Sequence, residues 1–151
     1  KKEHERSSGL GVGEMCIKDS RTSVRVITQG LIKLRRIEGT LAKAIKAEAY
    51  RDFYMHRVGH WIGIDVHDVG DYKIDEKWRL LEPGMVTTIE PGIYIAPDNK
   101  RVPKQWRGIG VRIEDDVLVT KKGNRVLTTG IPKTVAEIET FMAQAKQKRA
   151  A

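Results

Sequence analysis

Three of the four histidines in the sequence lie within twelve residues, a grouping that could bind a metal ion or transfer protons. They are His56, His60 and His67. Imidazole is the commonest neutral metal ligand, and it also titrates near neutral pH. Two histidines four residues apart can share a zinc ion, but the zincin motif needs glutamate directly after the first histidine, where Arg57 stands here. The spacing alone leaves two interpretations open, a metal or catalytic site and structural histidines with satisfied hydrogen bonds.

Two glutamates occur in segments whose patterns are typical of strands. Glu90 ends the run Val86-Thr87-Thr88-Ile89 just before Pro91, and Glu114 lies among alternating apolar residues. Because side chains alternate along a strand, Thr88 shares a face with Glu90, and Arg112 shares one with Glu114. If these faces point inward, both carboxylates need a cation or another partner. For Glu114 that cation is a metal ion or Arg112 in a structural ion pair, and the pattern does not choose between them.

Short strands that would carry these glutamates are predicted for the second half of the chain. Their expected ranges are 85–89, 93–95, 110–120 and 125–128. Pro-Gly pairs precede the first two, and Lys-Lys-Gly-Asn between the last two is a hairpin signal. The pattern therefore predicts an antiparallel sheet.

Helices are predicted on both sides of these strands. Apolar residues at three- and four-residue spacing over 31–49 indicate helical structure. Thr134 and Glu137 have the spacing of a capping box, and an apolar stripe beginning at Val135 predicts a final helix ending near Arg149. The expected fold class is α+β, with a curved antiparallel sheet covered by helices on one side.

Composition limits the class of protein. The 151 residues suffice for one domain, and 40% hydrophobic with 32% charged residues is typical of a soluble globular protein. Residues 1–23, which include Ser-Ser-Gly and Gly-Val-Gly, are predicted to be an irregular segment before a single domain over 24–151. No apolar run is long enough to cross a bilayer. Together with the single cysteine, Cys16, the polar N-terminus favours a cytoplasmic location.

The formal charge of +8 raises the question of a nucleic-acid partner. The densest basic groups are Lys33–Arg36 and Lys146–Arg149, and no nucleic-acid motif surrounds either. Ordinary solvated surface is therefore favoured over a polyanion site.

Five segments, taken in order, resemble the C-terminal part of aminopeptidase P (Xaa-Pro aminopeptidase), a family of pita-bread metallopeptidases related to prolidase and methionine aminopeptidase. They span residues 56–63, 65–70, 81–86, 88–94 and 108–115, and the resemblance continues from about residue 30 to the C-terminus. The resemblance implies the C-terminal half of a pita-bread fold. It also implies metal-dependent hydrolysis of an N-terminal Xaa-Pro bond, with a peptide carrying proline at its second position as substrate.

The resemblance implies a role for each matching residue. The family binds two divalent ions, usually Mn²⁺, through two aspartates, one histidine and two glutamates, and a hydroxide between the ions attacks the scissile carbonyl. The expected metal ligands are His60, Glu90 and Glu114, and the expected catalytic residues are His56, His67 and Arg112. Glu114 is expected to bridge both ions, with Arg112 supporting its carboxylate. Hard oxygen ligands suit Mn²⁺, although other divalent ions remain possible.

The two aspartate ligands of the family have no clear match. Asp19 begins an Asp-Ser-Arg-Thr run similar to the family's Asp-x-Thr-Arg pattern, but it lies too close to His60, and Asp52 is the only other upstream aspartate. The resemblance therefore implies a fragment, a split or deleted gene product, or a chain whose other half is separate. Alone, such a chain is expected to bind Mn²⁺ weakly and to be inactive.

Half a fold also leaves apolar sheet surface open. We therefore expect self-association, cover by a helix formed from residues 24–50, or a missing N-terminal half as partner. The alternative function is a non-catalytic remnant that acts as a binding module, as some pita-bread relatives do with histones or RNA. Retention of His60, Glu90 and Glu114 favours descent from an active peptidase.

Overall fold

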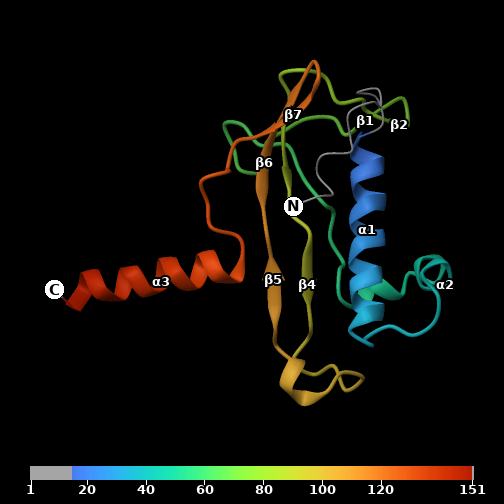
Figure 1. The fold of residues 1–151 in the computed structure, drawn as a ribbon. Helices are drawn as coiled ribbons and strands as arrows, with labels where there is room; N and C mark the ends of the chain where they lie inside the picture. Colours follow the sequence, from blue (N-terminus) through green and yellow to red (C-terminus); the bar gives the residue numbers. More distant parts are fainter. Residues whose placement is uncertain (1–14, 151) are drawn as a thin grey trace.

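The computed structural model describes residues 15–150 and confirms the expected α+β class (Figure 1). In chain order the elements are α1 (Met15–Lys33), α2 (Leu41–Lys46), the 3-10 helix η3 (Ala49–Asp52), β1 (Lys73–Ile74), β2 (Lys77–Trp78), β3 (Val86–Ile89), β4 (Gly92–Tyr94), the 3-10 helix η4 (Lys104–Trp106), β5 (Gly110–Arg112), β6 (Asp115–Thr120), β7 (Gly123–Val126) and α3 (Val135–Ala150). The strands pair antiparallel as β3-β6-β7, β4-β5 and β1-β2. In the described part of the chain, no helix has the length and apolar character that a membrane span requires.

The strand predicted over 110–120 is two strands, β5 and β6, separated by Ile113 and Glu114. The β3–β6 and β4–β5 ladders share one register, and this register places Glu90 opposite Glu114 in the gap. Pro91 interrupts the ladder because it has no N–H to donate. Its carbonyl still accepts a bond from the Ile113 N–H at 3.4 Å. A single proline thus leaves two opposed glutamates at the junction of two short ladders.

Helix α1 runs beside β4 and forms the larger core with it (Figure 1). Ile27 and Leu31, four residues apart, face this core. The buried members of the cluster are Ile27, Leu31, Ile37, Ala44, Phe53, Tyr54, Ile95 and Val102. A second cluster, of Trp61, Leu81 and Val119, lies under β6 and the loop before β3. Phe53 and Tyr54, at the start of the loop that precedes β1, belong to the larger cluster, so helix α1 fixes this end of the loop.

Two sequence predictions about the helices need correction. Residues 15–23, predicted to be irregular, belong to α1, because the glycine-rich composition is confined to the residues before it. Residues 1–14 lie outside the described residues. The helical pattern over 31–49 is also interrupted, since α1 ends at Lys33 and α2 begins at Leu41. Arg35 and Gly39 have positive φ angles of 55° and 90°, which helical backbone does not allow.

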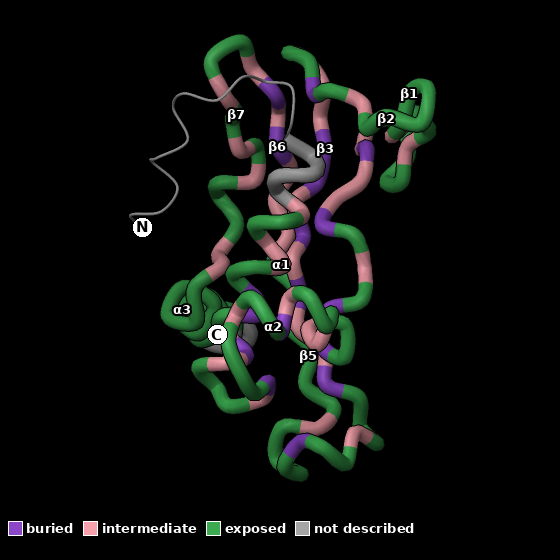
Figure 2. Tube along the Cα trace, turned by 90° about the vertical axis from the view of Figure 1, so that its right-hand side faces the viewer, coloured by how far each residue is buried: buried purple, intermediate pink, exposed green. Residues whose placement is uncertain are grey.

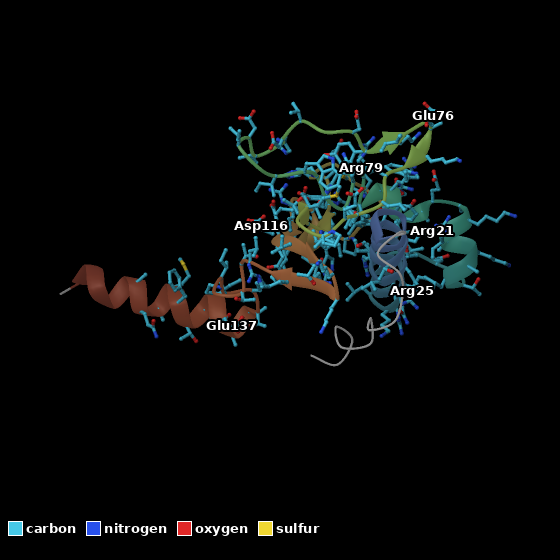
Figure 3. All side chains as sticks on the ribbon, turned by 90° about the horizontal axis from the view of Figure 1, so that it is seen from above. Arg21, Arg25, Glu76, Arg79, Asp116 and Glu137 are labelled. Atoms are coloured by element: carbon cyan, nitrogen blue, oxygen red, sulfur yellow. The ribbon has the colours of Figure 1, made fainter. Side chains whose placement is uncertain are left out.

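The final helix is confirmed together with its capping box. The Glu137 N–H donates to Thr134 Oγ1 at 3.3 Å, and the Thr134 N–H donates to Glu137 Oε2 at 2.9 Å. An ion pair between Lys133 and Asp115 of β6 joins the start of the helix to the sheet. Beyond this link α3 projects away from the other elements (Figures 1 and 3), and most of it is coloured as exposed in Figure 2. Its apolar side chains are exposed, including Phe141 at 60%.

Candidate metal centre

His60 is positioned by a loop that lies along the free edge of β3. The Thr88 N–H donates to the His60 carbonyl at 2.9 Å, and the Glu90 N–H donates to the Val58 carbonyl at 2.7 Å. A Cβ atom at Gly59 would lie 2.0 Å from the Thr88 carbonyl oxygen, so only glycine allows this close approach. The loop behaves as an extra strand, and it brings the histidine beside a glutamate 30 positions later in the chain.

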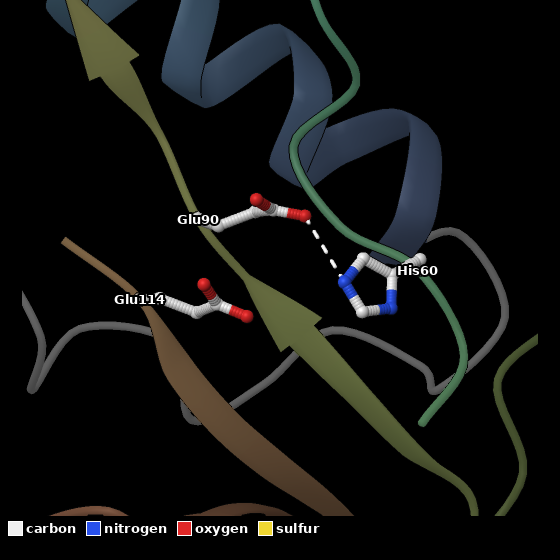
Figure 4. Close-up of side chains that lie close together, drawn as sticks. All are labelled: His60, Glu90 and Glu114. Carbon is white, nitrogen blue, oxygen red and sulfur yellow. Dashed lines mark ion pairs between the residues drawn. The ribbon is translucent and has the colours of Figure 1, made fainter. Parts of the chain in front are cut away.

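His60, Glu90 and Glu114 converge, as the sequence predicted (Figure 4). One ligand atom from each lies within 4.8 Å of the other two. His60 Nε2 and Glu90 Oε1 are 3.3 Å apart, and their side chains are 14% and 11% exposed. Glu114, at the gap in the strand, is more open at 36%. The group combines one imidazole and two carboxylates, which are ligands for divalent transition metals.

The Trp61 carbonyl oxygen, which contacts Nδ1 of His60, indicates which ring nitrogen carries a proton. Nδ1 lies 2.9 Å from the Trp61 carbonyl oxygen, which can only accept, so Nδ1 carries the proton. If the ring is neutral, Nε2 is a lone-pair atom that faces a carboxylate oxygen, Glu90 Oε1. Two acceptors at 3.3 Å repel each other unless a proton or a cation lies between them. Two atoms that bind one ion at about 2.1 Å are about 3.0–4.2 Å apart, so this distance also suits a shared ion.

Arg112 contacts both glutamates, so the predicted ion pair and the predicted cluster coexist. Its Nε lies 3.6 Å from Glu90 Oε2 and 3.7 Å from Glu114 Oε2. With neutral His60, the four side chains carry one net negative charge. The cluster therefore favours a cation, while Arg112 reduces the repulsion between the carboxylates.

Thr88 links the histidine to the first glutamate. Its side chain is fully buried, and its Oγ1 accepts a bond from the His60 N–H at 3.0 Å. The same hydroxyl donates to Glu90 Oε1 at 3.5 Å, a long contact. The sequence pattern places Thr88 on the face of Glu90 but predicts no part for it in the site. The two-residue spacing was the only available signal, because the contact with His60 spans 28 residues.

His56 lies near the cluster but is not one of its members. Its Nδ1 is 2.7 Å from the Arg57 carbonyl oxygen and must donate, so Nε2 accepts from the Tyr94 hydroxyl at 2.9 Å. Both ring nitrogens are therefore satisfied, as the structural interpretation expects. Tyr54 packs edge-on against the same ring, and burial with the nearby charge of Glu90 raises the pKa of Tyr54 to about 12. Tyr94 was not predicted as a site residue.

His67 is brought to His60 by a closed loop. The two ring centroids are 4.3 Å apart and the rings are tilted by 58°. The loop closes because the Asp68 N–H donates to the Trp61 carbonyl at 3.0 Å, and the Asp68 carboxylate accepts from the Ile64 N–H at 3.2 Å. His67 is exposed, so its ring lies beside His60 on the solvent-accessible side of the loop.

Neither upstream aspartate is seen to join the cluster. Asp52 forms an ion pair with Arg101, with 2.7 Å between Oδ2 and Nη2. Asp19 belongs to α1, but its side chain lies outside the described residues. Within the part of the chain that the structure describes, the group consists of His60, Glu90 and Glu114.

Comparison with known proteins places these residues in a family context. The profile of Metallopeptidase family M24 matches residues 16–121. The Xaa-Pro aminopeptidases of Haemophilus influenzae and Escherichia coli are 55% and 50% identical to the chain over 119 and 125 residues, which are 79% and 83% of the chain. The chain spans only 27% and 28% of their lengths.

Solved structures agree with this similarity. Aminopeptidase PepP of Pseudomonas aeruginosa superposes with a TM-score of 0.79 at 54% identity, covering 90% of this chain and 35% of that one. Aminopeptidase P of Escherichia coli with the inhibitor Pro-Leu gives 0.76 at 42% identity, with coverage of 90% and 34%. A zinc-substituted form with product gives 0.75 at 42% identity, with coverage of 89% and 34%. These neighbours have the pita-bread fold that the sequence predicted.

Proposed function

Because the chain belongs to metallopeptidase family M24, we propose that it carries part of the active site of a metal-dependent aminopeptidase. The proposed reaction is hydrolysis of the bond between an N-terminal residue and a following proline. The names of the similar aminopeptidases support this choice of substrate. The observation that carries the proposal is the convergence of His60 Nε2 and Glu90 Oε1, 3.3 Å apart, with a Glu114 carboxylate oxygen within 4.8 Å of both ligand residues.

We propose His60, Glu90 and Glu114 as the metal ligands. Their ligand atoms lie within 4.8 Å of one another, and opposite ligands of one ion are about 4.2 Å apart, so small side-chain movements would bring all three onto one ion. Carboxylate oxygens favour Mn²⁺, and a zinc-substituted relative supports other divalent ions as well. When bound, a pair of such ions would polarise a carbonyl group and lower the pKa of water between them.

The number of carboxylates limits how much metal this chain can hold. Two divalent ions bring four positive charges to a cluster whose net charge is one negative, because Arg112 offsets one carboxylate. Such an excess of positive charge is unfavourable in a partly buried site. We therefore propose that the chain alone holds one ion weakly, and that a two-ion site needs carboxylates from another segment.

The remaining predicted residues have roles in handling substrate. Arg112 would orient both glutamates, and the exposed His67 would move protons to or from the peptide. His56, held by Tyr94, would contact the substrate at the edge of the cluster. The single cysteine fits a reducing compartment, so we propose that the activity is cytoplasmic.

Metal titration followed by a peptide assay tests this proposal. Isothermal titration with Mn²⁺ should show weak binding of about one ion, and Glu114→Gln and Glu90→Gln should abolish it. Glu82→Gln is the matched control, since Glu82 is exposed and outside the cluster. Peptides with proline or alanine at the second position should both remain uncut by the chain alone.

Two results would change this interpretation. No Mn²⁺ binding at millimolar concentration would favour the non-catalytic binding module. Turnover of the proline peptide by the chain alone, lost in Glu114→Gln, would show that other residues replace the family's aspartates.

A further inference from the structure

A separate cavity of about 180 Å³ lies between α1 and β3. The residues that line it are Ser20, Arg21, Arg57, Val58, Gly59, Trp61, Tyr72, Trp78, Leu81, Thr87, Thr88 and Ile89. None of the three candidate metal ligands is among them. The cavity is therefore distinct from the cluster, although Thr88 contributes to both.

The walls and size of the cavity suit one aromatic ring. Most of the cavity surface comes from apolar groups. These include the rings of Trp61, Tyr72 and Trp78 and the side chain of Leu81. A cavity of about 150 Å³ in another protein takes up benzene, so 180 Å³ accommodates a phenyl ring with a short substituent. Trp61 stacks on Tyr72 at a centroid distance of 5.5 Å, which gives the cavity a flat, rigid aromatic side.

The charged side chains among the described residues that line the cavity are Arg21 and Arg57, and none of these lining residues is acidic. Both arginines are exposed, and neither forms an ion pair with a described residue. The guanidinium carbon of Arg57 lies 5.5 Å from the centroid of the Tyr72 ring, at the aromatic wall itself. Guanidinium groups bind carboxylates through paired hydrogen bonds.

From these observations we infer that the cavity binds a small carboxylate with a single aromatic ring. The ring would lie among Trp61, Tyr72 and Trp78, and the carboxylate would contact Arg57 or Arg21 at the opening. A neutral apolar molecule would fill the same space without using the arginines. This site goes beyond the proposed peptidase activity, and it can be tested without any metal.

Tryptophan fluorescence gives a direct test. The full chain with Trp106→Phe keeps only Trp61 and Trp78, both of which line the cavity. Titration with 3-phenylpropionate should change the emission and saturate. The neutral analogue 3-phenylpropanol should bind about tenfold more weakly, since charge-assisted hydrogen bonds are about twice as strong as neutral ones.

Variants identify the site. Arg57→Met and Arg21→Met together should reduce carboxylate affinity to that of the alcohol. Arg25→Met is the matched control, because Arg25 lies four residues along the same helix and does not line the cavity (Figure 3). Ser20→Phe, which adds a ring at the cavity from the helix surface, should weaken binding of both probes.

Several results would overturn the inference. Equal affinity for the acid and the alcohol would remove the role of the arginines. An undiminished affinity in Ser20→Phe, or no saturable change in emission, would exclude the cavity as the site. Probe binding that disappears as the protein self-associates would identify a second copy of the chain as the occupant.

Discussion

Replacing Thr88 by valine removes one buried hydroxyl and keeps the shape of the side chain. The His60 N–H loses its acceptor at 3.0 Å, and Glu90 Oε1 loses a donor at 3.5 Å. Leaving a buried donor unsatisfied costs about 1–3 kcal/mol. At about 2 kcal/mol, the melting temperature of a chain this size should fall by roughly 4–8 °C. Thermal unfolding in the presence of a chelator measures this change without a contribution from metal.

The same substitution should weaken metal binding. Loss of a group that orients a metal ligand typically costs about 10–100-fold in affinity. Thr88→Ser keeps the hydroxyl and should bind Mn²⁺ nearly as well as the parent chain, although removal of its methyl group costs about 1 kcal/mol of stability. Thr87→Val is a second control, since the His60 carbonyl that loses the Thr87 hydroxyl still accepts the Thr88 N–H. If Thr88→Val leaves stability and Mn²⁺ affinity unchanged, the hydroxyl does not support the cluster.

Three further predictions concern other parts of the molecule. The pKa of Tyr54 is raised to about 12, so its contribution to stability is complete below pH 10 and is lost as pH rises through 12. In Tyr54→Phe, spectroscopic titration should lack the last-titrating tyrosine, and unfolding measurements should lack the associated alkaline loss of stability. The exposed apolar side chains of α3 predict self-association. The double substitution Phe141→Ser with Met142→Ser should lower the mass measured by light scattering, and a parent chain that is already monomeric would contradict this prediction. Thr134→Ala removes the helix cap and should cost about 1 kcal/mol, read as reduced helical circular dichroism, whereas Thr134→Ser should have little effect.

The features that the sequence predicted correctly have local signals. The capping box at Thr134 and the β6–β7 hairpin depend on residues close together in the chain, and both are confirmed. Alternation predicts that Thr88 shares a face with Glu90 and Arg112 with Glu114, and both pairs are in contact. The resemblance to a known family then identified which polar side chains share a cluster.

The features that were missed depend on contacts between distant segments. The pairing of the His60 loop with β3 spans about 28 residues, and no local pattern encodes it. Pro91 does signal a broken ladder, but the effect on the opposite strand at Ile113 requires the register. The stripe on α3 predicts a helix and says nothing about whether another surface covers it.

The interrupted ladder also bears on motion in the hairpin. Residues 90–91 and 113–114 have fewer cross-strand hydrogen bonds than the ladders on either side, so this point is the natural hinge between two stiffer blocks. Glu90 and Glu114 belong to opposite strands of that hinge. An ion bound by both glutamates would cross-link the two strands at the hinge, so that the two blocks would open as one cooperative unit. The backbone amides near the hinge would then exchange with solvent more slowly.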